Sequence, residues 1–114
     1  MLIKLSRLAT WTIIAAITVL SLAPGSEMIP IGRGLTEHFL AYLVFAAAAA
    51  LGYGRKLGYG TLVVIAVVAA ALFEFAQGWV PGRAASVNDF AASSLGAFLG
   101  VTIAVWLRSL IAAK

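Results

Sequence analysis

Four side chains suited to acid–base or hydrogen-bonding chemistry lie close together in this sequence: Glu74, Gln77, Arg83 and Asp89. His38, the only histidine, lies in a separate apolar segment. A histidine beside carboxylates can transfer protons, and the planar guanidinium of an arginine can hold a carboxylate or phosphate with two hydrogen bonds. The set therefore suits either acid–base work on an anionic substrate or the binding of a polar ligand, and the spacing does not separate these two.

The composition excludes several classes of function. The chain has no cysteine, which excludes disulfides and thiolate chemistry, and its single histidine leaves no Cys/His set for a structural zinc site. It contains no phosphate-binding loop, no HExxH motif and no GxSxG motif. We therefore expect neither a metal nor a cofactor. The net charge of +4 comes from basic residues near the ends of apolar segments, which fits anionic lipid and not nucleic acid.

Hydrophobic residues make up 63% of the 114 residues and charged residues only 11%, whereas soluble domains carry about 25% charged residues. This composition predicts an integral membrane protein. Crossing a bilayer takes about 20 apolar residues, and four segments qualify: 5–23, 35–53, 58–79 and 87–110. Short turns at 54–57 (GRKL) and 80–86 (VPGRAAS) predict antiparallel neighbours. We therefore expect one all-α domain over residues 1–114, folded as a four-helix transmembrane bundle.

The first segment has features of a secretory signal peptide. Lys4 and Arg7 precede an apolar run that ends in the small residues Ser21 and Ala23. Pro24 follows directly and argues against cleavage. The sequence therefore predicts a retained first helix.

The basic residues predict the orientation of the bundle in the membrane. With a cytoplasmic N-terminus, six basic residues lie inside: Lys4, Arg7, Arg55, Lys56, Arg108 and Lys114. Only Arg33 and Arg83 then lie outside, which satisfies the positive-inside rule. We therefore expect both termini in the cytoplasm.

This topology places the candidate residues at the outer side of the membrane. His38 lies at the start of the second helix, Glu74 and Gln77 at the end of the third, and Arg83 and Asp89 in and after the outer turn. Glu74 precedes the expected interfacial residue Trp79 by five positions, which puts it roughly 7 Å below the boundary. An unpaired charge there costs a few kcal/mol, so we expect Glu74 to be protonated or paired with His38 or Arg83.

Some of these residues also have structural interpretations. Ser86 and Asp89 have the spacing of a capping box, which favours a helix cap over a catalytic group for Asp89. Glu37 follows Thr36, a plausible N-cap, and suits a first helical turn. A buried ion pair without chemistry is the structural alternative for Glu74 and Arg83.

Small residues predict where the helices pack. Gly96 and Gly100 form a small-xxx-small pattern that Ala92 and Ala104 extend. The alanine run at 46–50 indicates a second surface of close helix contact. We expect both stretches to face other helices.

These motifs together resemble one known family. HFLAY at 38–42, Glu74 with Gln77, PGR at 81–83, and Asp89 followed by GAFLG at 96–100 are similar in order and spacing to the VanZ-like family, over residues 37–100. Its members are small multi-helix membrane proteins of bacteria, and its namesake is associated with low-level teicoplanin resistance. The resemblance implies a multi-pass protein of the bacterial cytoplasmic membrane, with a cell-envelope precursor or a glycopeptide as partner beside the lipid bilayer. It also implies motif positions at His38, Glu74, Gln77, Arg83 and Asp89.

Two departures from the family pattern remove polar groups from the proposed site. Gly34 and Leu35 stand where members often carry an Asp-Lys pair, and Ser93 stands where many carry Asn. These departures concern the site and leave the membrane interpretation unchanged.

Three functions remain open at this point. The first is a binding or accessory protein whose outer pocket affects glycopeptide susceptibility. The second is a membrane-embedded enzyme acting on a lipid-linked or anionic envelope substrate, with His38, Glu74 or Asp89 as catalytic candidates and Arg83 holding the anion. The third is an ion or proton pathway, which is weakest because the inner half has no matching chain of polar residues.

Overall fold

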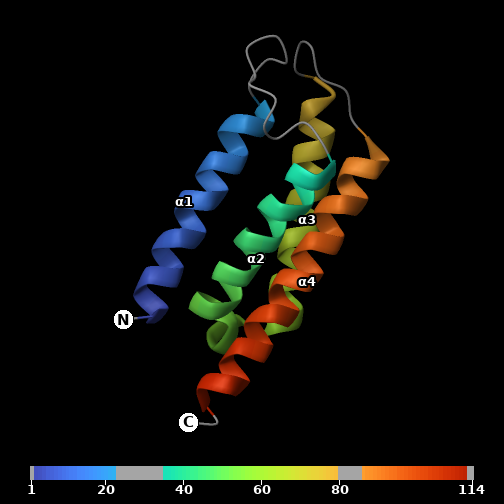
Figure 1. Cartoon of the computed structure of the whole chain (residues 1–114). Coiled ribbons are helices and arrows are strands. Elements are labelled where there is room, and N and C mark those ends of the chain that lie inside the picture. Colours follow the sequence, from blue (N-terminus) through green and yellow to red (C-terminus); the bar gives the residue numbers. More distant parts are fainter. Residues whose placement is uncertain (1, 23–34, 80–85, 113–114) are drawn as a thin grey trace.

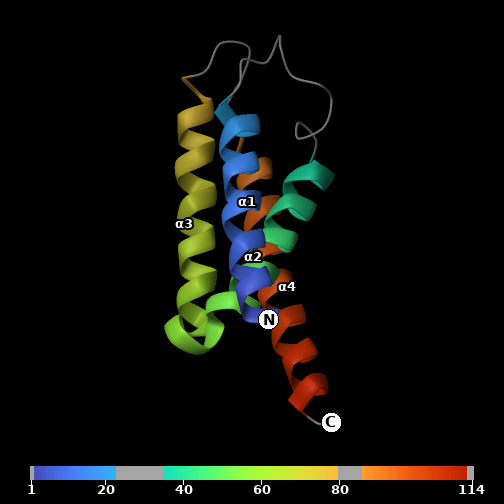
Figure 2. The same cartoon turned by 90° about the vertical axis from the view of Figure 1, so that its left-hand side faces the viewer.

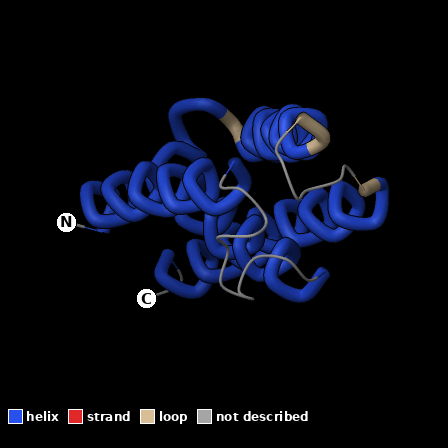
Figure 3. Tube along the Cα trace, turned by 90° about the horizontal axis from the view of Figure 1, so that it is seen from above, coloured by secondary structure: helices blue, strands red, loops and turns tan. Residues whose placement is uncertain are grey.

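The computed structural model describes residues 2–22, 35–79 and 86–112. It contains four α-helices: α1 (Leu2–Leu22), α2 (Leu35–Leu57), α3 (Tyr59–Gln77) and α4 (Val87–Ala112) (Figure 1). Figure 3 shows helices and short loops, with no strand among the described residues. Each helix is long and apolar enough to cross a membrane. The prediction of an all-helical, four-span membrane protein is therefore confirmed.

Helix α2 lies at the centre of the bundle and contacts each of the other three helices, most extensively α4. Helix α1 packs on α2 and α3, and its described residues do not reach α4 (Figures 1 and 2). The start of α2, the end of α3 and the start of α4 share one end of the bundle, while the α2–α3 junction lies at the other (Figure 1). Residues far apart in the sequence therefore meet at the first end.

The contact between α2 and α4 depends on small residues. Ala50 of α2 and Ala97 of α4 are fully buried, and Gly96 and Gly100 present no side chain to the facing helix. A Cβ atom added at Gly96 would overlap the carbonyl oxygen of Phe39. Because lipid tails are as apolar as the helices, such close packing is a main source of helix association in a bilayer. The predicted packing role of both glycines is confirmed.

Polar contacts attach α1 to the C-terminal part of α2. Arg7 donates from Nε to the carbonyl oxygen of Gly52 at 2.8 Å, and its guanidinium carbon lies 4.6 Å from the centre of the Tyr53 ring. Trp11 donates from its indole nitrogen to the Tyr53 hydroxyl at 2.8 Å. A Cβ atom at Gly52 would lie only 2.9 Å from Cγ of Arg7, so the glycine permits this approach. These contacts give α1 a specific place in the bundle, while its retention after signal-peptide processing stays a prediction.

Two local predictions were wrong. The GRKL stretch at 54–57 is not a turn, because α2 continues through Leu57 and the chain turns at Gly58, whose φ is +91°. Gly54 is helical and lies against the Tyr59 ring, and the basic residues suit the negative end of the helix. Thr36 is not the N-cap, because α2 begins at Leu35, although Glu37 does lie in the first turn.

Replacement of Gly100 by alanine tests directly whether the α2–α4 contact depends on the missing side chain. Gly100→Ala should destabilise the bundle by about 1–3 kcal/mol, because the added methyl group would meet the Leu43 carbonyl and lie 3.0 Å from the Ala47 nitrogen. Gly60→Ala is the matched control, since nothing lies within 4 Å of its Cβ position. The measurement is the midpoint of thermal unfolding in detergent. Equal midpoints for the two variants would contradict the packing role of Gly100.

Candidate functional site

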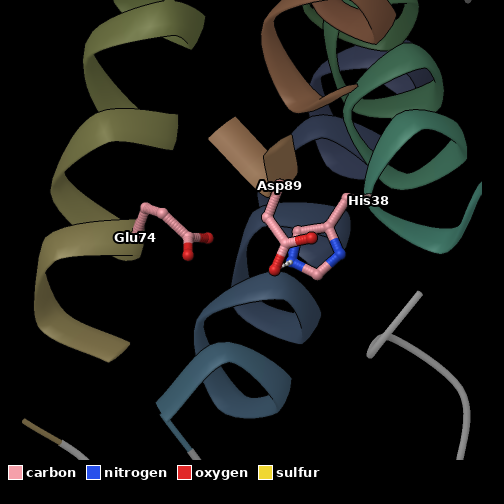
Figure 4. Close-up of side chains that lie close together, drawn as sticks. All are labelled: His38, Glu74 and Asp89. Atoms are coloured by element: carbon pink, nitrogen blue, oxygen red, sulfur yellow. Dashed lines mark ion pairs between the residues drawn. The ribbon is translucent and has the colours of Figure 1, made fainter. Parts of the chain in front are cut away.

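Three ionisable side chains meet at the end of the bundle where α2 and α4 begin and α3 ends. His38 comes from the first turns of α2, Glu74 from the last turn of α3 and Asp89 from the first turn of α4 (Figure 4). One nitrogen or oxygen atom of each side chain lies within 4.8 Å of the corresponding atoms of the other two. The structure thus brings together three of the five residues singled out in the sequence. We define His38, Glu74 and Asp89 as the polar cluster.

Within the polar cluster, His38 and Asp89 form a salt-bridge pair at long range. Nε2 of His38 lies 3.9 Å from Oδ2 of Asp89, with 10% and 19% of the two side chains exposed. This separation is longer than a hydrogen bond, so the two groups interact through space without sharing a proton directly. Such a spacing leaves room for a third atom between or beside them.

Glu74 replaces Asp89 in one half of the helix cap. The hydroxyl of Ser86 accepts a hydrogen bond from the Asp89 backbone N–H at 3.2 Å, which is the first half of the predicted capping box. The second half would bring the Asp89 carboxylate to the Ser86 N–H, but Oε2 of Glu74 accepts that hydrogen bond instead, at 2.6 Å. The Asp89 carboxylate is directed to His38 (Figure 4). The structural interpretation of Asp89 as a full capping residue is therefore wrong.

Three further polar residues near the members of the polar cluster along their helices are buried. Gln77, only 3% exposed, lies three residues after Glu74 on α3. Tyr42 follows His38 by four positions on α2, and Ser93 follows Asp89 by four on α4, so each shares a helix face with its partner. Both are nearly fully buried. The sequence identifies Ser93 only as a serine in place of the Asn that many family members carry. Its spacing of four residues from Asp89 is the signal that both lie on the same helix face.

Arg83 lies outside the described residues, as do Pro81 and Gly82. Its predicted contact with Glu74 or with an anionic ligand stays a prediction. The geometry of the polar cluster is described without it.

A cavity of about 260 Å³ borders Glu74. Its walls are the last turns of α3 and the first turn of α4, with Ala71, Phe75, Val87 and Phe90 supplying apolar surface and Ser86 a polar edge. The Glu74 side chain thus lies between an apolar cavity and the rest of the polar cluster. A ligand with a polar group and an adjoining apolar chain would match these two surfaces.

The charges at this site need compensation. Glu74 is only 8% exposed, and a second carboxylate lies within the same 4.8 Å cluster. Two ionised carboxylates at this spacing in a poorly solvated place repel each other unless positive charge lies near them. Groups of this kind suit both the ligand-binding and the acid–base alternatives.

Comparison with known proteins places the chain in a family. The profile of the family described as VanZ/LLP1 matches residues 13–108. No curated protein and no solved structure matches the chain. The family match covers most of the sequence and includes all three residues of the polar cluster. The chain, with its four membrane-spanning helices, therefore belongs to the VanZ/LLP1 family.

Proposed function

We propose that the protein resides in the bacterial cytoplasmic membrane with both termini in the cytoplasm and the polar cluster at the extracytoplasmic face. The excess of basic residues at one end of the bundle supports this orientation. Arg7 binds the carbonyl oxygen of Gly52, and Arg108 binds that of Leu51, both near the C-terminal end of α2. His38 lies near the opposite end of the same helix. Among the described residues, the basic groups thus lie toward one end of the bundle and the acidic groups toward the other.

At the outer face, the protein binds a component of the cell envelope and thereby affects glycopeptide susceptibility. The observation that carries this proposal is the convergence of His38, Glu74 and Asp89 from three helices on one poorly exposed point. Ionisable residues inside membrane spans are costly and mark functional sites by default. A purely structural ion pair needs two residues and no adjoining cavity, whereas this site has three residues and a cavity of about 260 Å³.

The main alternative is a membrane-embedded enzyme acting on a lipid-linked or anionic envelope substrate. The position of His38 Nε2 at 3.9 Å from Asp89 Oδ2 favours it, because two groups this near could both contact one substrate and exchange protons with it. Glu74 or His38 would act as acid or base, and Arg83 would hold the anion. Incubation of purified protein with envelope lipids separates the two functions, since only an enzyme changes the lipids chemically.

The orientation is testable by cysteine labelling, because the chain has no native cysteine. A cysteine introduced at Ser26 should react with an impermeant maleimide in intact cells, and one introduced at Lys56 should react only after the membrane is opened. Labelling at Lys56 alone in intact cells would reverse the proposed topology.

Glu74→Gln tests the functional role of the polar cluster. The amide oxygen of glutamine can still accept the hydrogen bond from the Ser86 N–H, so the variant should reach normal membrane levels. It should nevertheless lose the effect of the protein on glycopeptide or envelope-stress sensitivity, because the carboxylate charge is gone. The measurement pairs the protein level in membranes with the minimal inhibitory concentration.

Glu37→Gln is the matched control, since Glu37 lies beside His38 in the first turn of α2 but is not a member of the polar cluster. It should leave both protein level and sensitivity unchanged. If the protein's effect on sensitivity falls only in proportion to its level in membranes for both variants, the functional role of Glu74 is refuted.

A further inference from the structure

The polar cluster has the donor set of a metal site. It offers one imidazole nitrogen and two carboxylate oxygens, each from a different helix. The expectation of no metal was based on the lack of a Cys/His set for structural zinc. The lack of a Cys/His set does not exclude a site with one histidine and two carboxylates. Metals with open coordination positions are commonly held by three such protein ligands.

The distances within the polar cluster are close to those that one ion requires. Atoms bound to one transition-metal ion at about 2.0–2.2 Å lie about 3–4 Å from one another. His38 Nε2 and Asp89 Oδ2, at 3.9 Å, already satisfy this range. The three donor atoms as a set lie within 4.8 Å, so closure asks for a movement of about 1 Å. Small rotations of the His38 and Asp89 side chains can supply that movement without a shift of the helices, while Glu74 keeps its hydrogen bond to the Ser86 N–H.

The charge of the cluster favours a divalent cation. Two ionised carboxylates in a poorly exposed site repel each other, and a divalent ion bound by both would offset that repulsion while the imidazole serves as its third ligand.

An outer contact already orients one ligand. The Ser86 N–H donates to Oε2 of Glu74 at 2.6 Å, which fixes the plane of the carboxylate beside Asp89 and His38. Hydrogen bonds of this kind to ligand side chains are a regular feature of metal sites, and their loss typically weakens binding about 10–100-fold. The helix cap of α4 thus also serves as a support for Glu74.

We propose that His38, Glu74 and Asp89 bind one divalent first-row transition-metal ion, and that the ion's open positions receive an anionic oxygen of the ligand. A mixed nitrogen and oxygen donor set without thiolate suits Zn²⁺ or Mn²⁺ better than Cu⁺, and the imidazole disfavours Mg²⁺ and Ca²⁺. The cavity beside Glu74 lies next to the ion and can hold the apolar part of the ligand. This inference rests on the proposed function, because it concerns the same site and names the group that would contact a phosphate or carboxylate.

The test uses the full-length protein, purified in detergent through a tag without histidine and stripped with a chelator. Zn²⁺ and Mn²⁺ are then titrated separately, and bound metal per chain is measured by elemental analysis after desalting, beside the thermal midpoint. We expect about one equivalent of one of these metals and a midpoint that rises with its concentration, because a ligand that binds only the folded state stabilises it.

His38→Gln, Glu74→Gln and Asp89→Asn should each weaken binding at least about 10-fold, the lower limit for losing even an outer-shell partner. Their thermal midpoints without metal show whether each variant still folds, so lost binding is not confused with misfolding. Glu37→Gln is the matched control and should bind as the unchanged protein does. If the His38 variant does not fold, the two carboxylate variants carry the test, because Asn and Gln preserve side-chain size.

Failure of this proposal is distinguishable from failure of the proposed function. Absence of stoichiometric binding, or binding that all three variants retain, would overturn the metal site and would indicate only adventitious surface metal. Loss of the sensitivity effect in Glu74→Gln with no metal bound by the unchanged protein would leave the proposed function standing alone. Metal binding that depends on all three residues supports the site even where the sensitivity effect is absent.

Discussion

The backbones of α2 and α4 approach so closely that no side chain fits between them at two successive turns, and the candidate site depends on this approach. Gly96 meets the carbonyl of Phe39, and Gly100 meets that of Leu43. Phe39 directly follows His38, and Asp89 lies two turns before Gly96 on α4. The separation of the two helix backbones thus determines how near the His38 imidazole and the Asp89 carboxylate come. A wider helix spacing would move these two groups further apart than the observed 3.9 Å.

A second constraint brings α3 to the same point. Backbone N–H groups at a helix start have no partner within the helix, and a capping box satisfies two of them with side chains of the same helix. Here the Ser86 N–H is bound by Glu74 of α3, while the Ser86 hydroxyl serves the Asp89 N–H. One local requirement of α4 therefore becomes a tertiary contact, and the Asp89 carboxylate is directed elsewhere. The positions of both carboxylates in the polar cluster are thus linked to the fact that Glu74, and not Asp89, accepts the hydrogen bond from the Ser86 N–H.

The sequence predicts the features that depend on local pattern. Apolar segments of membrane length predict four helices, and the GAFLG stretch predicts the closest helix contact, because both signals lie within a single segment. The predicted end of α2 is wrong because the GRKL stretch is helical and not a turn, and Gly54 within it accommodates the Tyr59 ring. That choice depends on a side chain of the next helix, which periodicity alone does not reveal.

The same reason explains what was missed at the site. The sequence singles out His38, Glu74 and Asp89 because their side chains suit acid–base chemistry and the predicted topology puts them at the same side of the membrane, and the structure brings all three together. The capping-box spacing identified Ser86 correctly but assigned the wrong carboxylate to its N–H, since both Glu74 and Asp89 satisfy the chemistry and only the packing of α3 on α4 decides between them. The sequence identifies Ser93 only as a departure from the family's Asn, although it is buried and lies on the same helix face as Asp89.

The two ends of α2 show how one helix serves both the fold and the site. Near its C-terminal end, arginines from α1 and α4 donate to the carbonyls of Gly52 and Leu51, so hydrogen bonds from charged side chains hold the neighbouring helices there. Near its N-terminal end, His38 faces two carboxylates that lie on α3 and α4. At the C-terminal end of α2, arginine side chains bind backbone carbonyl groups. At its N-terminal end, two carboxylates lie near a side chain, that of His38. Because side chains can exchange partners without unfolding a helix, the second end is where the proposed ligand would bind and leave while the packing of the bundle stays intact.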